Sequence, residues 1–104
     1  MRKTSEPDFD YSKLDDLIHS RIRLAIMAVL ISVDQADFNL LKQKVNATDG
    51  NLSVHLKKLE DANYLSVKKG FIGRKPQSIY KLTAIGRKAF EAYLDRLEQL
   101  IQRK

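Results

Sequence analysis

Cysteine and tryptophan are absent from this chain of 104 residues, and proline occurs only twice. The absence of cysteine excludes disulfides, a thiol nucleophile and every thiolate metal site, and it suits a reducing cytosol. Long apolar runs are also missing: the longest, Leu24–Ile31, has eight residues, whereas a helix needs roughly 20 to cross a bilayer. No charged and then apolar leader opens the chain, so we expect no signal peptide and a cytoplasmic protein.

The charge of the chain is unevenly distributed. Hydrophobic residues make up 43% and charged residues 31% of the sequence, as in one globular domain. The formal net charge is +6, and the segment 57–88 alone carries nine basic residues against two acidic ones, or +7. A polyanionic partner, nucleic acid or an anionic membrane, is therefore expected to meet the second half of the chain.

The first eleven residues differ from the rest. They are polar, contain Pro7 and show no periodicity, so residues 1–11 are expected to form a flexible arm before a domain over residues 12–104. A basic arm can enter a minor groove, but Arg2 and Lys3 are mixed here with three acidic residues. The arm is therefore assigned no role.

Helix signals begin directly after the arm. Ser12 with Asp15 three residues later is typical of a capping box, which predicts a short helix. Ser20 either caps a second helix or lies inside the first one as it continues. The apolar residues from Ile22 to Val33 recur at helical spacing, which predicts a mostly buried helix.

Two short capped helices follow a polar break. Phe38 is an isolated apolar residue after that break and is interpreted as a short edge strand. Asn39 is a good N-cap for a helix over Leu40–Val45, and Thr48 caps the next helix, expected over residues 49–62. Two capped helices joined by three or four residues are the outline of a helix-turn-helix.

The pattern then changes to strands. The apolar residues from Tyr64 to Ile72 predict one strand, and Ile79–Leu82 predicts a second. The residues 73–76 between them form a basic turn with glycine and proline. Thr83 caps a long final helix. This order predicts a winged helix-turn-helix, a mainly α fold with a small β-hairpin (α+β) and a long C-terminal helix.

The second helix of the helix-turn-helix has two distinct sides at 100° per residue. The residues expected to face the core are Leu52, Leu56, Leu59 and Asn63. In a helix-turn-helix, the N-terminal part of the second helix meets base edges in the major groove of DNA. The DNA-binding candidates on this helix are therefore Gly50, Asn51, Ser53, Val54, Lys57 and Lys58. The alternative is an ordinary solvated helix face.

Each of these candidates has a chemical reason. Gly50 permits close approach of the backbone, and Asn51 and Ser53 both donate and accept hydrogen bonds. Val54 can contact a thymine methyl group. The two lysines suit phosphates. Asp49 would repel phosphate, so it is interpreted as a residue that offsets the helix dipole.

The hairpin, or wing, carries four further DNA-binding candidates. These are Lys68, Lys69, Arg74 and Lys75. A wing lies along the DNA backbone beside the recognition helix, so its cations meet phosphates or the minor groove. The arginine is the better candidate for the minor groove. The alternative is that the lysines protect an exposed sheet edge from pairing.

The final helix has more apolar surface than a small core can cover. Part of it repeats in a 3-4-3 spacing typical of a coiled-coil seam, so a second copy of the chain is the expected cover, with residues 84–104 as the dimerisation helix. A cofactor site is the alternative. The dimerisation candidates are Leu14, Leu17, Ile18, Phe90, Tyr93, Leu94, Leu97, Leu100 and Ile101.

Four segments together resemble the small winged-helix transcriptional regulators related to the MarR and ArsR groups. They are residues 17–26 (LIHSRIRLAI), 48–60 (TDGNLSVHLKKLE), 69–76 (KGFIGRKP) and 80–83 (YKLT). The resemblance covers roughly residues 14 to 95, and it implies a homodimer that binds operator DNA, with repression as the usual outcome.

The chain also departs from this pattern. The family often has proline where Arg21 stands, so the first helix can continue unbroken here. Metal-sensing ArsR relatives carry a cysteine pair, which this chain lacks. Full-length MarR proteins have longer terminal helices that shape a ligand pocket, so an effector and its site stay unassigned.

The leading hypothesis is a dimeric regulator that binds double-stranded DNA. The alternative is a winged-helix module that binds another protein. An enzyme is not expected, because no metal-ligand cluster, phosphate-binding glycine loop or nucleophilic constellation is present, and no cofactor is expected. His55 lies at the border of the core and is interpreted as structural, and His19 is assigned no chemistry. A membrane role is not expected, because the basic face has no apolar counterpart.

Overall fold

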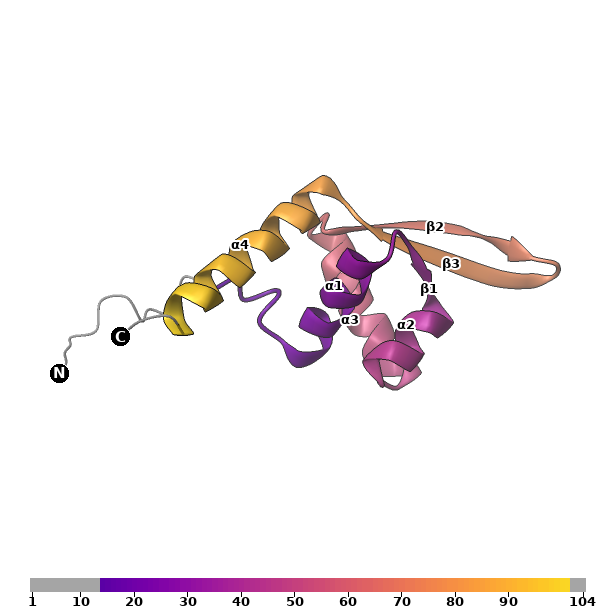
Figure 1. The fold of residues 1–104 in the computed structure, drawn as a ribbon. Helices are drawn as coiled ribbons and strands as arrows, with labels where there is room; N and C mark the ends of the chain where they lie inside the picture. The colour runs from indigo at the N-terminus through magenta and orange to yellow at the C-terminus, as the bar shows by residue number, and fades with distance from the viewer. Residues whose placement is uncertain (1–13, 102–104) are drawn as a thin grey trace.

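The computed structural model describes residues 14–101, which form four helices and one three-stranded antiparallel sheet (Figure 1). In chain order the elements are α1 (Arg21–Ser32), β1 (Ala36–Asp37), α2 (Phe38–Val45), α3 (Asp49–Asp61), β2 (Leu65–Ile72), β3 (Lys75–Leu82) and α4 (Ala84–Ile101). The predicted winged helix-turn-helix is confirmed. Helices α2 and α3 form the helix-turn-helix, strands β2 and β3 form the wing, and α4 follows.

Three of the predicted helix caps are confirmed. The hydroxyls of Ser20, Thr48 and Thr83 each accept the backbone N–H three residues further on, at 3.4, 3.2 and 2.9 Å. Ser20 is itself extended (φ −151°). Helix α1 therefore begins at Arg21 and is not the continuation of an earlier helix.

The predicted start of α2 is wrong by two residues. The cap is Asp37, whose Oδ1 accepts the N–H of Leu40 at 2.8 Å, and not Asn39. The edge strand is Ala36–Asp37, and Phe38, predicted as the strand, is the first residue of α2. Aspartate is as good an N-cap residue as asparagine. Asp37 is both the last residue of β1 and the N-cap of α2, so the strand and the helix are joined without a linker.

A short helix was predicted after Ser12. In the described part of this segment, residues 14–20 form turns and no helix. The Asp15 carboxylate accepts the N–H groups of Leu17 and Ile18, at 2.9 and 3.3 Å. These local bonds satisfy backbone donors in a turn and compete with a longer helix. Ser12 and the predicted arm over residues 1–11 lie outside the described residues.

The hydrophobic core draws on all four helices and on the roots of the strands. Helix α3 contributes Leu52, Leu56 and Leu59, all almost completely buried, and α4 contributes Phe90 and Tyr93. The other buried apolar residues are Leu14, Ile18, Ile26, Met27, Leu30, Ala36, Leu41, Val45 and Leu65. The outer part of the wing has no share in this core.

In the sheet, β3 lies between β1 and β2. It begins at Lys75, four residues before the predicted strand, so the turn shrinks to Gly73 and Arg74, with Gly73 at φ +62°. Pro76 pairs with Phe71 of β2, whereas β1 pairs only with Ile79 and Tyr80. With no neighbour on its other side, β3 tolerates a residue without an N–H at this point.

The molecule is elongated, with extents of 60 × 26 × 21 Å. Figure 1 shows the wing and α4 leaving the helical body in opposite directions. At the joint between them, the Thr83 N–H donates to the Tyr64 carbonyl at 3.0 Å. A Cβ added at Gly86 would lie 2.1 Å from that carbonyl oxygen. The glycine thus allows the first turn of α4 to touch the start of the wing.

Candidate nucleic-acid interface

Helix α3 presents its predicted outer face to solvent. All six candidates on it, Gly50, Asn51, Ser53, Val54, Lys57 and Lys58, are exposed. Their exposure follows from the three leucines that anchor the opposite face in the core. Asn63 was predicted to face inward and does not: it is exposed, beyond the helix end, with φ 65°. Asparagine tolerates this left-handed conformation, which ends the helix there.

The N-terminus of α3 is tied to α2 by an ion pair that the sequence did not predict. Lys42 Nζ lies 2.8 Å from the carboxylate of Asp49, the first residue of α3. The negative charge is favourable at this helix end, while Thr48 provides the cap. A Cβ added at Gly50 would meet nothing within 4 Å. No packing inside the protein therefore requires this glycine, and it leaves the start of α3 open to a close partner.

Further along α3, Lys57 donates to Asp61 at 2.7 Å, one turn later. The hydrogen bond to Asp61, and then its charge, raise the pKa of Lys57. Both side chains are exposed, and an ion pair in water is weak. A phosphate can displace Asp61, and Lys57 stays charged in either arrangement.

His55 forms part of a polar contact between α1 and α3. Arg23 Nη1 lies 2.8 Å from His55 Nδ1, and Arg23 also donates to the carbonyl of Leu17. Burial, then the charges of Arg23 and Lys58, lower the pKa of His55. A neutral imidazole that accepts from arginine fixes the position of α3 on α1, which fits a structural histidine.

His19 also has a partner. Its Nδ1 lies 2.7 Å from the hydroxyl of Tyr93 on α4. A second hydrogen bond holds the turn before α1 in place: the carboxylate of Asp15, in this turn, accepts from the Tyr64 hydroxyl at 2.5 Å. These contacts join positions more than forty residues apart, so spacing along the chain gave no signal for them.

The four wing candidates, Lys68, Lys69, Arg74 and Lys75, are all exposed. They lie on both strands and on the turn, with no acidic residue anywhere in 62–90. Repulsion among these cations is unfavourable, and a polyanion relieves it. The wing therefore presents only positive charges to a partner, whereas α3 presents a mixture of polar and charged side chains.

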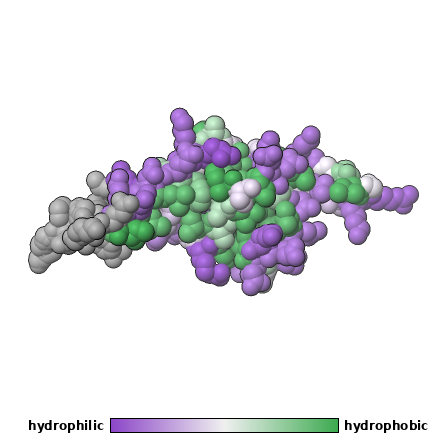
Figure 2. Space-filling model, viewed as in Figure 1, coloured by the Kyte–Doolittle hydropathy of each residue, from purple (hydrophilic) through white to green (hydrophobic). Residues whose placement is uncertain are grey.

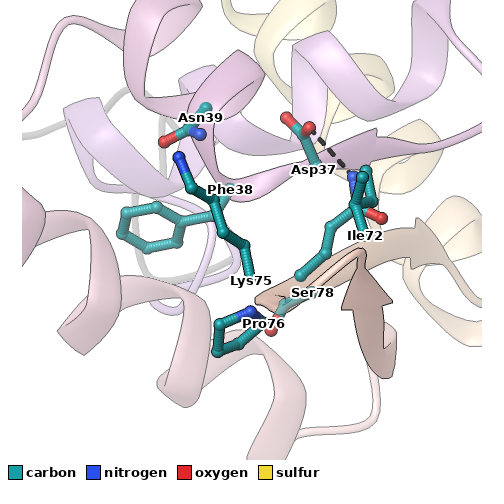
Figure 3. Close-up of a pocket in the computed structure, with 8 residues that line it drawn as sticks. Asp37, Phe38, Asn39, Ile72, Lys75, Pro76 and Ser78 are labelled. Carbon is teal, nitrogen blue, oxygen red and sulfur yellow. Dashed lines mark hydrogen bonds between the residues drawn. The ribbon is translucent and has the colours of Figure 1, made fainter.

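A hollow of about 350 Å³ lies between the wing and the start of α2 (Figure 3). Gln77 of β3 donates to the second carboxylate oxygen of Asp37 at 3.4 Å across it. Figure 3 shows the Lys75 side chain pointing toward Asn39. Asp37 thus caps α2 and holds the wing beside it. Sequence reasoning missed this role because it placed the cap at Asn39.

The predicted dimerisation residues fall into three groups. Leu14, Ile18, Phe90 and Tyr93 are buried within the protomer, because the turn before α1 packs against the first half of α4. Leu17, Leu97 and Leu100 are half-buried against the same core, while Leu94 and Ile101 are 44% and 76% exposed. The dimer stays a prediction, and its accessible apolar surface is smaller than the sequence indicated.

Two absences apply to the described residues. No helix within 14–101 is long and apolar enough to span a membrane. In the same part of the chain, no group of three or more histidine or acidic side chains is placed to hold a metal ion.

Comparison with known proteins identifies the family. The model of a family described as a winged helix DNA-binding domain matches residues 22–101, so the chain belongs to that family. An uncharacterized protein of Methanocaldococcus jannaschii, MJ0432, is 42% identical to it over 84 residues, which are 81% of this chain and 91% of that protein.

Solved structures agree with this assignment. A transcriptional regulator homologue from Pyrococcus horikoshii OT3 is similar at a TM-score of 0.75 and 26% identity, over 82% of this chain and 84% of that chain. A MarR-family protein from Porphyromonas gingivalis W83, described as a putative transcriptional regulator, gives 0.68 at 18% identity, over 99% and 100% of the two chains, a likeness of fold alone. The chain is thus a winged-helix DNA-binding regulator of MarR-like fold and not an enzyme.

Proposed function

We propose that this protein is a homodimeric regulator of transcription that binds a specific sequence in double-stranded DNA, with repression as the expected outcome. Helix α3 would enter the major groove, and the wing would lie on the adjacent backbone or minor groove. The observation that carries the proposal is the joint exposure of all ten candidate residues on α3 and the wing. The protein would act in the cytoplasm, on chromosomal DNA.

The polar start of α3 supports readout of bases. Asn51 and Ser53 are both exposed within the first five residues of α3, near the open backbone of Gly50. An asparagine amide can pair with both the N6 and the N7 of an adenine. Val54, 54% exposed, offers an apolar contact to a thymine methyl group. These groups contribute sequence preference, and the surrounding lysines contribute affinity that is independent of sequence.

Helix α4 supports the dimer. In its outer half Leu97 and Leu100 are half-buried against the core, while Leu94 and Ile101 remain exposed. A twofold axis through this region would give the complex two α3 helices. In such regulators the two helices enter the major groove about 34–36 Å apart, one turn of duplex, so the operator is expected to be a palindrome.

The decisive experiment is selection of bound duplexes from a random pool with the purified protein. The expected result is a palindrome whose half-sites are centred about ten base pairs apart. The logarithm of the binding constant for the selected duplex should fall linearly with the logarithm of the salt concentration, with a slope of about −0.9 for each phosphate neutralised. Selection of no sequence, with weak binding that is flat in salt, would refute the proposal.

A variant pair separates base readout from backbone contact. Asn51→Ala should relax the preference at one position of each half-site, while Lys58→Ala should weaken binding to every duplex about equally. An equal loss on all sequences for Asn51→Ala would remove this residue from base readout. A purified complex with one stoichiometric protein partner and no DNA would instead favour a protein-binding module.

A further inference from the structure

The end of the wing is apolar as well as basic. Phe71 and Ile72, at the end of β2, are 73% and 63% exposed, and Pro76, opposite Phe71 on β3, is exposed too. We call these three residues the apolar tip. In Figure 2 a small green patch with purple side chains around it lies near the right-hand end, where Figure 1 places the ends of β2 and β3.

The apolar tip is not explained by the packing of the protomer. Leu65 at the root of β2 is buried and Val67 is half-buried, but every residue of β2 from Lys68 onward is exposed. The third strand, β1, pairs with β3 only at Ile79 and Tyr80 and so does not reach the tip. Large exposed apolar groups set apart from the core are typical of a binding surface.

The charge around the tip identifies what it fits. Lys75 pairs with Ile72 at the apolar tip and Arg74 lies in the turn beside it, while Lys68 and Lys69 lie three and two residues before Phe71 on β2. Strands β2 and β3 carry no acidic residue. An apolar centre with a purely cationic border complements a surface with phosphates at its edges and stacked bases between them. The minor groove of a duplex has this arrangement, and it is about 6 Å wide.

The reach of the wing agrees with this partner. The five exposed residues Lys68–Ile72 span roughly 16 Å at about 3.3 Å per residue. Neighbouring grooves of a duplex lie half a turn apart, about 17 Å for a turn of about 34 Å. A wing that leaves the body beside α3 therefore has the length to bring its tip from the major groove to the next minor groove.

We propose that Phe71 is an apolar wedge that enters the minor groove next to the major groove bound by α3 and partly unstacks one base step there. Ile72 and Pro76 would flank the wedge, and Arg74 and Lys75 would hold the phosphates on either side. Inserted apolar side chains of this kind bend the duplex toward the major groove. This inference rests on the proposed DNA-binding function and adds deformation of the DNA to it.

The test uses the full chain and the duplex selected from the random pool. 2-Aminopurine, which fluoresces more when unstacked, replaces single bases along the duplex, and a dye pair on its ends reports bending. With the wild-type protein, one position per half-site should brighten and the ends should approach each other. When the duplex is saturated with the Phe71→Ala variant, the brightening and the bending should both vanish. The affinity of this variant should stay within about tenfold of the wild-type affinity, because the loss of contacts is offset by the unstacking energy that is no longer spent.

Three matched variants complete the design. Ile85→Ala removes a similar side chain, 57% exposed on α4, and should leave both signals unchanged. Arg74→Ala with Lys75→Ala should lower affinity but keep the brightening once the duplex is saturated. Phe71→Leu should keep most of the brightening, because leucine also acts as a wedge. Thermal unfolding followed by circular dichroism should be the same for all Phe71 variants, since this side chain is exposed.

The outcomes are distinguishable. Unchanged brightening and bending with Phe71→Ala, or their loss with Phe71→Leu, would overturn the wedge while leaving DNA binding intact. Binding to phosphatidylserine vesicles that is tighter than binding to the duplex, and that disappears in Phe71→Ala, would overturn it in favour of a membrane contact. Failure of the wild type to bind any duplex would refute the proposed function itself.

Discussion

The wing and the outer half of α4 leave the core in opposite directions, and both carry apolar side chains that the protomer leaves exposed. Their charges differ. The wing, β2 and β3 with the turn between them, has five basic residues and no acidic one, whereas residues 91–101 of α4 have three acidic residues and one basic residue. An apolar surface among cations alone complements a polyanion. An apolar surface among mixed charges complements another protein, which the proposed function takes to be a second copy of the chain.

The largest effect is expected where this comparison assigns the dimer. Leu94→Asp with Ile101→Asp places charges on exposed positions of α4, so the protomer should fold while the dimer dissociates. Loss of one of two linked half-site contacts should weaken binding to the palindrome by at least about 100-fold. Analytical ultracentrifugation and fluorescence anisotropy measure the two quantities.

Ile85→Asp is the control for this change, because it adds the same charge to an exposed position at the other end of α4. It should leave the dimer intact. A double variant that remains dimeric would show that the outer half of α4 is not the dimer surface.

The second effect concerns the joint where the wing and α4 meet. Gly86→Ala forces a Cβ against the backbone carbonyl of Tyr64, and such overpacking should lower the free energy of unfolding by about 2–3 kcal/mol or more. Gly50→Ala is the matched change in a helix with open space around it, and it should raise stability by up to about 1 kcal/mol. Urea unfolding measures both, and equal effects would contradict a tight joint.

The third effect separates the charges of the two regions. Arg74→Ala with Lys75→Ala should reduce the slope of log affinity against log salt by about 1.8, because two phosphate contacts are lost. Arg103→Ala with Lys104→Ala removes the same charge from the end of the chain, beyond the described residues, and should change the slope little. Equal slopes for the two variants would mean that only the overall charge matters.

The smallest effect concerns the Arg23–His55 contact between α1 and α3, in the helical body from which both regions extend. The pKa of His55 is lowered in the folded state, so the neutral form stabilises the fold above about pH 6.5, the ordinary histidine value. This contribution should be lost as the pH falls below that value. His55→Gln keeps an acceptor for Arg23 but cannot titrate, so it should unfold with a weaker dependence on pH between 7 and 5. Urea unfolding at the two pH values checks the difference, and identical pH dependence of variant and wild type would contradict it.

Local signals predicted much of this fold. Thr48 and Thr83 cap the helices that they were expected to cap, Ser20 takes the capping role that was one of its two alternatives, and the three leucines of α3 face the core as their spacing indicated. The errors arose where two local signals competed. Asp37 and Asn39 are both good caps, and only the pairing of Asp37 with Ile79 of β3 shows which one ends the strand and starts the helix.

The candidate interface shows the same division. Exposure of the ten DNA-binding candidates followed from periodicity and from charge, both of which are local. The Lys42–Asp49 pair, the Arg23–His55 contact and the Asp37–Gln77 bond join different elements, and no spacing rule connects their partners. They set the position of α3 and the wing, on which a fit to DNA depends.

The sequence by itself determined the order of helices and strands, the inner face of α3 and the basic character of the wing, because each depends on neighbours a few residues apart. The tertiary structure decided which apolar residues remain free. Leu14, Ile18, Phe90 and Tyr93 are buried together in the core of the protomer, while Phe71, Leu94 and Ile101 remain exposed in the described part of the chain. The spacing of these residues along the chain did not separate them, whereas burial does, because it depends on contacts between distant parts of the chain.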